Sequence, residues 1–151
     1  MSRTEIKDAI APCGLCCETC FAHVDGKIRR LALELKEKLG NFEPYAMKFE
    51  TLLGNPIFSR YTSFKEMLDY FASENCRGCR KENCRLFKEC GVSKCFEDQE
   101  VDFCHECSLF PCDKTNFDPV LHKTWLAVNQ KIRKVGIEDY YEHVRTACRY
   151  P

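Results

Sequence analysis

The sequence has no apolar run long enough to cross a membrane. A membrane-spanning helix needs about 18 or more consecutive apolar residues, and polar or charged residues interrupt every apolar stretch before that length. Residues 1–5 also contain no apolar segment of the kind that a secretory signal requires. We therefore expect a protein without a membrane partner, located in the cytoplasm.

The sequence also lacks net charge, because 23 Lys and Arg residues balance 23 Asp and Glu residues. This balance argues against nucleic acid as a partner, since general electrostatic attraction would be weak. Locally, residues 76–96 carry six basic and two acidic side chains, whereas residues 97–113 carry six acidic side chains and no Lys or Arg. The basic stretch fits either a solvated surface or a region that stabilises nearby thiolates.

Common signatures of catalysis are missing as well. The sequence contains no phosphate-binding glycine loop, no GxSxG nucleophile elbow and no fixed pair of carboxylates. No alternation of strands and helices is visible, so a thioredoxin-like redox fold is not predicted. The sequence therefore favours a binding role over an enzyme and leaves the partner unknown, with another protein as the candidate.

What the sequence does have is thirteen cysteines. They form an N-terminal group at residues 13–20 and a central group at residues 76–112, with Cys148 alone near the end. A chain of this length can bury roughly 70 per cent of its unfolded surface without disulfides. In a reducing cytoplasm, closely spaced cysteines indicate metal ligands or redox thiols.

The N-terminal group, "CGLCCETC", can be divided in two ways. It is either two CxxC pairs, in which Cys16 is a ligand, or one CxxxCxxC triplet of Cys13, Cys17 and Cys20. The triplet has the spacing with which radical S-adenosylmethionine enzymes hold an iron–sulfur cluster. Those enzymes need a full or partial βα barrel, and helical patterns follow Cys20 here, so we do not expect that activity.

The central group contains two CxxC turns, Cys76–Cys79 and Cys104–Cys107. Two such turns are typical of tetrahedral zinc, because a two-residue spacer lets both sulfurs face one ion. Four thiolates also suit an iron–sulfur cluster, so an iron–sulfur or thiol-based redox protein is the alternative. His23 and His105 lie close to cysteines, but with so many thiols we expect them to be surface or supporting side chains.

Helical patterns occupy the sequence on both sides of the central group. Apolar spacing and capping residues predict helices over residues 28–39, 44–53 and 118–135, one that opens at Ser63, and one from about residue 138. The Ser63 helix would turn Phe64, Met67, Leu68 and Phe71 inward, and the last helix would bury Cys148. Residues 75–117 show little periodicity, apart from a turn or two around residues 81–89.

The predicted fold class is therefore mainly α, with at most short strands. We expect a single domain over residues 1–151. In it, a helical body formed by about residues 25–74 and 118–148 supports an irregular, metal-stapled, cysteine-rich segment.

The order of the motifs resembles a known family. "CGLCCETC", "CRGC", "CGVSKC", "FCHECSLFPC" and "KVGIEDYYEH" together resemble the bacterial and archaeal proteins of domain of unknown function 3795, a cysteine-rich family for which zinc binding has been suggested. The resemblance selects the triplet and implies ten family cysteines: Cys13, Cys17, Cys20, Cys76, Cys79, Cys90, Cys95, Cys104, Cys107 and Cys112. It leaves Cys16, Cys84 and Cys148 outside the pattern.

These ten thiols would fill two four-thiolate zinc sites and leave two thiols over. We expect one site to consist of Cys76, Cys79, Cys104 and Cys107. The other would join Cys13, Cys17 and Cys20 to one thiol of the central segment, from Cys90, Cys95 or Cys112. Closed sites of this kind would stabilise a small interaction module.

Overall fold

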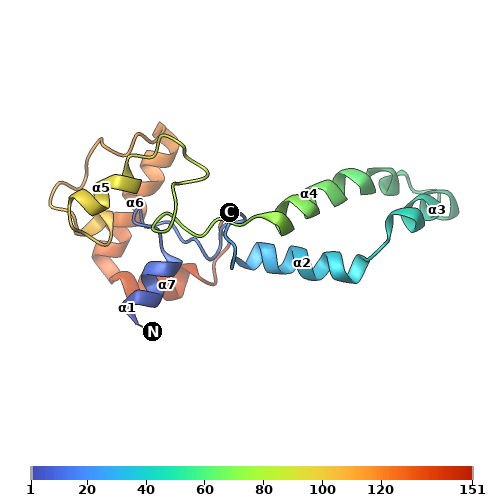
Figure 1. Ribbon diagram of the computed structural model, residues 1–151, viewed down its shortest axis with the longest axis horizontal. Helices are drawn as coiled ribbons and strands as arrows, with labels where there is room; N and C mark the ends of the chain where they lie inside the picture. Colours follow the sequence, from blue (N-terminus) through green and yellow to red (C-terminus); the bar gives the residue numbers. More distant parts are fainter. Residues whose placement is uncertain (1, 151) are drawn as a thin grey trace.

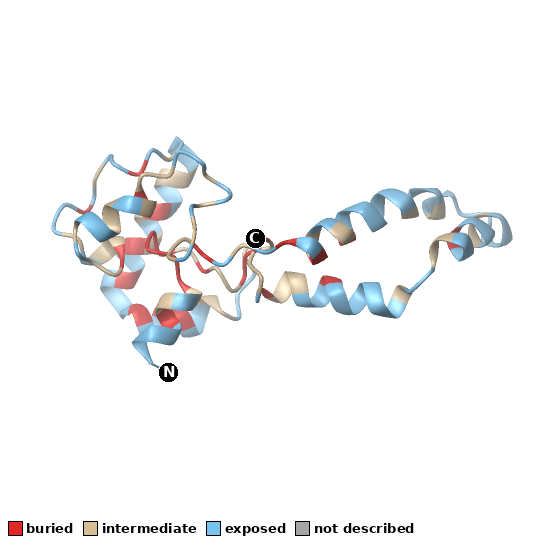
Figure 2. Cartoon of the chain, in the orientation of Figure 1, coloured by how far each residue is buried: buried red, intermediate tan, exposed pale blue. Residues whose placement is uncertain are grey.

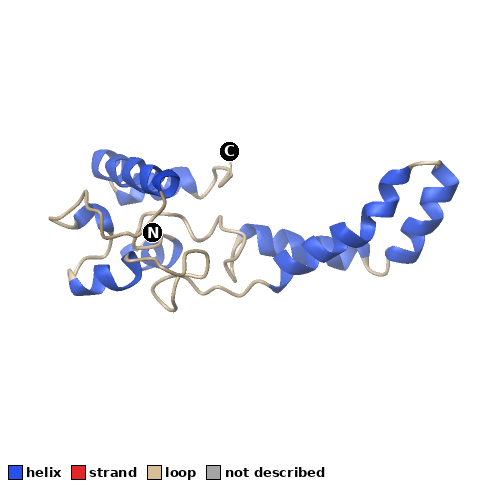
Figure 3. Cartoon of the chain, turned by 90° about the horizontal axis from the view of Figure 1, so that it is seen from above, coloured by secondary structure: helices blue, strands red, loops and turns tan. Residues whose placement is uncertain are grey.

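A helical arm projects from a cysteine-rich body in the computed structural model, which describes residues 2–150 (Figure 1). The described residues form seven α-helices and two 3-10 helices, and no strand: α1 (Arg3–Ala9), α2 (Lys27–Leu39), α3 (Glu43–Leu53), η1 (Pro56–Arg60), α4 (Tyr61–Ser73), α5 (Val92–Asp98), η2 (Cys104–Glu106), α6 (Pro119–Val135) and α7 (Ile137–Val144). Irregular loops connect the helices of the body (Figure 3). The prediction of a mainly α fold is confirmed, and no helix between residues 2 and 150 is long and apolar enough to span a bilayer.

The arm consists of α2 and α4 packed side by side, with α3 and η1 at its tip (Figure 1). As predicted, α2 ends at Gly40 and α3 ends at Gly54, and both glycines have positive φ angles, 51° and 57°. The helix predicted to open at Ser63 instead begins at Tyr61, because η1 runs directly into α4 and leaves no capping position there. Phe64 and Met67, predicted to face inward, are 45% and 53% exposed.

In the body, α6 and α7 pack against each other, α7 also contacts α1, and α6 contacts η2. The predicted signals of α6 are all present: the Asp118 carboxylate accepts from the backbone N–H groups of Val120 (2.9 Å) and Leu121 (3.1 Å), and the helix ends at Gly136. Its buried face carries Trp125 and Ile132, so the core of the body lies along this helix (Figure 2).

The two predicted halves of the helical body are separate in the structure. Residues 27–73 form the arm, whereas residues 119–144 pack within the body. Amphipathic helices need a partner for the apolar face, but the pattern does not specify which partner. Here α2 and α4 cover each other through Ala32, Leu68 and Ala72.

Three local expectations also differ from the structure. The N-terminal helix α1 was not predicted, although Ser2 and Glu5 form the capping box that its sequence encodes. Residues 81–89 form turns and no helix. Cys148 is exposed, because α7 ends at Val144 and the following chain leaves the apolar face.

Replacement of Trp125 by alanine is expected to lower the free energy of unfolding by about 3–5 kcal/mol. The indole is 0% exposed and packs edge-on against Phe110, with ring centroids 5.0 Å apart. Urea unfolding measures the loss. Val120→Ala on the same helix is the control, because Val120 is 78% exposed and its removal should change stability by no more than about 0.5 kcal/mol. Equal losses in both variants would contradict this assignment of the core.

Candidate metal centre

The N-terminal cysteines lie on a chain of tight turns. Main-chain hydrogen bonds from Gly14 to Ala11 (2.8 Å), from Cys17 to Ala9 (2.7 Å) and from Cys20 to Cys17 (2.9 Å) define these turns. Gly14 has a φ of 89°, and a Cβ there would lie 2.8 Å from a methyl group of Val128 on α6. Only glycine therefore allows the loop to pack this closely against the helix.

The Cys76–Cys79 turn docks on this loop from the central segment. The backbone N–H of Cys76 donates to Ala22 O (3.0 Å), and the Val24 N–H donates to Cys76 O (2.8 Å). These bonds close the base of the arm, since α2 begins just after Val24 and α4 ends just before Cys76. Phe21 packs there against the rings of Tyr70 and Phe71 on α4. The base of the arm and the N-terminal cysteines are thus one unit.

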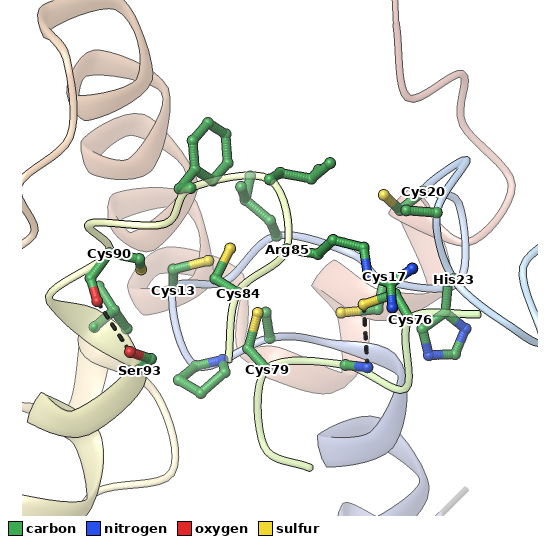
Figure 4. A pocket seen from close by; sticks show the side chains of 18 of the residues that line it. Cys13, Cys17, Cys20, His23, Cys76, Cys79, Cys84, Arg85, Cys90 and Ser93 are labelled. Carbon is green, nitrogen blue, oxygen red and sulfur yellow. Dashed lines mark hydrogen bonds between the residues drawn. The ribbon is translucent and has the colours of Figure 1, made fainter. Parts of the chain in front are cut away.

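A cavity of about 60 Å³ lies between the loop and the central segment. Eight cysteines line it: Cys13, Cys16, Cys17, Cys20, Cys76, Cys79, Cys84 and Cys90. Figure 4 shows the thiols of Cys13, Cys79 and Cys84 directed toward one another, with Cys90 beside Cys13. We name these four residues the first thiol group. Cys17 and Cys76 lie side by side farther along the cavity, toward Cys20 and His23 (Figure 4).

Within the first thiol group, Cys84 is the thiol that loses its proton most readily. Cys84 interacts with the thiols of Cys79 and Cys90, and these two contacts lower the pKa of Cys84 well below its ordinary value. The same contacts raise the pKa values of Cys79 and Cys90. These contacts favour the thiolate form of Cys84. The thiolate, and not the protonated thiol, is the form of cysteine that binds metals.

A second, smaller cavity of about 20 Å³ is lined by four further cysteines, Cys95, Cys104, Cys107 and Cys112. We name these the second thiol group. Helix α5 supplies Cys95, η2 supplies Cys104, and the loop after η2 supplies the other two. The loop is fixed by its backbone: Cys104 N–H donates to Pro12 O (2.8 Å), and Arg133 on α6 donates to Cys107 O (3.2 Å).

Trp125 also lines the second cavity and leaves a donor unsatisfied. Its Nε1–H is buried and has no nitrogen or oxygen partner among residues 2–150. Burial raises the pKa of Cys104 to about 12, and the Trp125 N–H acts in the opposite direction because it stabilises the thiolate. Buried donors are nearly always paired. A metal-bound thiolate at Cys104 would satisfy this one, so the residues fit a thiolate-bound metal.

The structure does not bring the two CxxC turns, predicted to share one ion, onto the same cavity. Cys76 and Cys79 line the first cavity, whereas Cys104 and Cys107 line the second. The two turns dock at different places on the N-terminal segment. The backbone N–H of Cys76 donates a hydrogen bond to Ala22 O, whereas the backbone N–H of Cys104 donates to Pro12 O.

The structure also does not place Cys13, Cys17 and Cys20 around one point together with a single thiol of the central segment, as predicted for the second site. Cys95 and Cys112, two of its three candidate partners, lie on the other cavity. Cys13 faces Cys84 and Cys79, whereas Cys17 lies beside Cys76 (Figure 4).

Each of the ten predicted cysteines lines one of the two cavities, and so do two cysteines outside the predicted set, Cys16 and Cys84. Cys84 lies at the centre of the first thiol group, although the resemblance leaves it outside. Its position between Cys79 and Cys90, in a segment with little apolar periodicity, was the available signal. Cys16 also lines the first cavity, but it packs into the core with Ile6 and Ile10.

His23 lines the first cavity but lies beyond Cys17 and Cys76, away from the first thiol group, and His105 lines neither cavity (Figure 4). The Nδ1 atom of His23 accepts the N–H of Asp25 (3.3 Å), so the neutral ring carries its proton on Nε2 and has no free lone pair there. The ring of His105 stacks on Phe103, with centroids 5.6 Å apart, outside the residues that line the two cavities.

All thirteen thiols, which lie within residues 2–150, are free of disulfides. In the same residues, no three His, Cys, Asp or Glu side chains already stand in the arrangement of a bound metal ion. The thiols of each group would therefore have to move closer together to hold an ion. The hydrogen bonds above fix the backbone at Cys76 and Cys104, one residue of each CxxC turn.

The family model described as "Protein of unknown function (DUF3795)" matches residues 9–117. The matched range includes both thiol groups and the whole arm, and it ends just before α6. Among curated proteins and solved structures, none matches the chain.

Proposed function

The chain belongs to the DUF3795 family of proteins of unknown function, and we propose that it is a zinc-binding protein whose metal sites hold the body together and present the arm to a partner. Each thiol group would hold one zinc ion through four thiolates. The sites would be structural, since all four positions of a tetrahedral ion would be filled by protein.

The second thiol group carries this proposal. Four sulfurs from α5, η2 and the following loop surround a cavity of about 20 Å³. A space of this size accepts about one water-sized sphere, which suits a single ion better than a cluster of iron and sulfide. The unpaired Nε1–H of Trp125 adds a donor for one of the thiolates.

The first thiol group is supported by its charge environment. Zinc with four thiolates carries a net charge of 2 − 4, or −2, and a buried charge needs compensation. Arg149 and Arg85 line the same cavity, and Arg85 also pairs with Glu74 (3.4 Å). The site would also fasten the base of the arm, because Cys13 comes from the N-terminal loop and its three partners come from the segment that follows α4.

A second candidate function concerns the first cavity alone. Its volume of about 60 Å³, its eight cysteines and its apolar lining by Leu15, Phe87 and Val92 suit an iron–sulfur cluster. The protein would then transfer electrons from this site.

Metal analysis of the freshly purified full-length protein, prepared without oxygen, tests the proposal. We expect about two zinc ions per chain and no absorbance in the visible range. Iron and sulfide with a visible absorbance band would reject the zinc proposal for the first cavity and support the second candidate. Less than about one zinc ion per chain, without iron, would contradict both.

A further inference from the structure

The arm carries most of the exposed apolar surface of the protein. Among residues 2–150, eleven of the sixteen exposed large hydrophobic side chains lie between residues 27 and 73: Leu31, Leu33, Leu35, Tyr45, Met47, Leu52, Leu53, Ile57, Phe64, Met67 and Tyr70. In the same segment only Ala32, Ala46, Leu68 and Ala72 are buried. Figure 2 shows this contrast between the pale arm and the buried core of the body.

The exposed side chains form stripes on both helices. Leu31 and Leu35 lie four residues apart on α2, and Phe64 and Met67 lie three apart on α4. Residues at these spacings share one face of a helix. A two-helix hairpin therefore satisfies only part of the apolar pattern that its sequence encodes.

We propose that the arm is a dimerisation element, in which the arms of two chains pack into a four-helix bundle through Leu31 and Leu35 of α2 and Phe64 and Met67 of α4. The proposal names the partner left open by the proposed function. It rests on the proposed function in one respect, that the arm is the part of the protein that binds a partner. It does not require that the metal is zinc.

The area of the exposed surface is sufficient for a dimer. At ~80 Å² for each half-exposed large side chain, the eleven exposed side chains of the whole arm offer roughly 900 Å² of apolar surface, and each partner in a stable complex contributes about 800 Å². The interface would therefore centre on the four named residues and extend along the arm to its tip. Interfaces between identical chains are more apolar than transient ones, and two-fold dimers are the commonest oligomers. Two helical hairpins that pack together form a bundle with a shared core.

The charge of the arm favours a second copy over other occupants. Residues 27–73 contain eight Lys and Arg and six Asp and Glu residues, a net charge of 8 − 6, or +2. Both signs are interspersed along α2, for example Glu34, Lys36, Glu37 and Lys38. A net charge of +2 repels an identical arm only weakly, and it does not provide the strong positive field that nucleic acid or an anionic membrane would require.

Sedimentation of the full-length, metal-loaded protein over a range of concentrations tests the proposal. The wild type is expected to sediment with twice the chain mass of 17.6 kDa. The double variant L31E/M67E should weaken dimerisation by about a hundredfold, because each change places a charge in an apolar interface. The control L109E/V120E introduces the same charges on the body, where these residues are 48% and 78% exposed, and should remain dimeric.

Far-UV circular dichroism and zinc content of each variant separate loss of the interface from loss of folding or metal. An L31E/M67E monomer with wild-type helicity and zinc supports the proposal. A wild type that is monomeric throughout overturns it, as does an arm variant as dimeric as the control. A monomer that binds nucleic acid or anionic vesicles gives the arm another occupant and also overturns it. The zinc content of the wild type is measured independently of its sedimenting mass, so failure of the zinc proposal is detected separately.

Discussion

Removal of the metal with a strong chelator is expected to unfold the cysteine-rich part of the body, residues 76–117, and to expose Trp125. This segment has few buried apolar side chains of its own: Val92, Phe103 and Phe110. The free energy of zinc binding to structural sites is about 10–16 kcal/mol, which is as large as the whole stability of a typical domain, about 5–15 kcal/mol. Without the ions, the free-energy cost of ordering the loops would exceed the stabilisation that the remaining contacts provide.

Fluorescence measures this unfolding directly, because Trp125 is the single tryptophan and lies on the second cavity. Its emission should shift to the wavelength of a solvent-exposed indole when the metal is removed and return when zinc, but not magnesium, is added back. The helices of the arm, which contribute no residue to either thiol group, should keep part of the circular dichroism. A chelated protein with unchanged emission would contradict a structural role for the metal.

Replacement of Cys84 by serine is expected to remove one of the two zinc ions. The Cys84 sulfur interacts with the thiols of Cys79 and Cys90, and both interactions lower its pKa. A serine hydroxyl stays protonated and is a poor zinc ligand, so the first site should lose affinity while the second stays filled. Elemental analysis of the purified variant measures the change, and Cys148→Ser is the matched control because Cys148 is exposed.

The result also decides between two assignments of the ligands. The structure puts Cys84 among the four sulfurs of the first group, whereas the family resemblance leaves it out. Full zinc content in Cys84→Ser, together with loss of one ion in Cys17→Ser, would favour the ligand set that the resemblance implies and reject the first thiol group as we define it.

The helices could be predicted where their ends carry local signals. Gly40 and Gly54 end helices in left-handed or related conformations, and Asp118 caps α6 through its own side chain. These signals act within a few residues, so they can be recognised in a single sequence. Even so, the sequence could not decide that α2 and α4 cover each other rather than α6, because an apolar stripe does not specify its partner.

The grouping of the cysteines could not be predicted from their spacing. The position of each CxxC turn depends on hydrogen bonds between backbone groups, such as Cys76 N–H to Ala22 O and Cys104 N–H to Pro12 O. Every non-proline residue offers these groups, so they leave no trace in the sequence. The family resemblance selected ten of the cysteines that line the two cavities and left out Cys84. The division of these cysteines between the cavities could be seen only once the loops were docked.

X-ray absorption at the zinc edge of the purified full-length protein tests the central claim, that two groups of four thiolates each hold an ion, most directly. We predict an environment of four sulfur atoms at about 2.3 Å from zinc, with no contribution from histidine nitrogen and with about two zinc ions per chain. An average of fewer than four sulfur ligands, a clear nitrogen or oxygen shell, or an absorption edge of iron in place of zinc would contradict it.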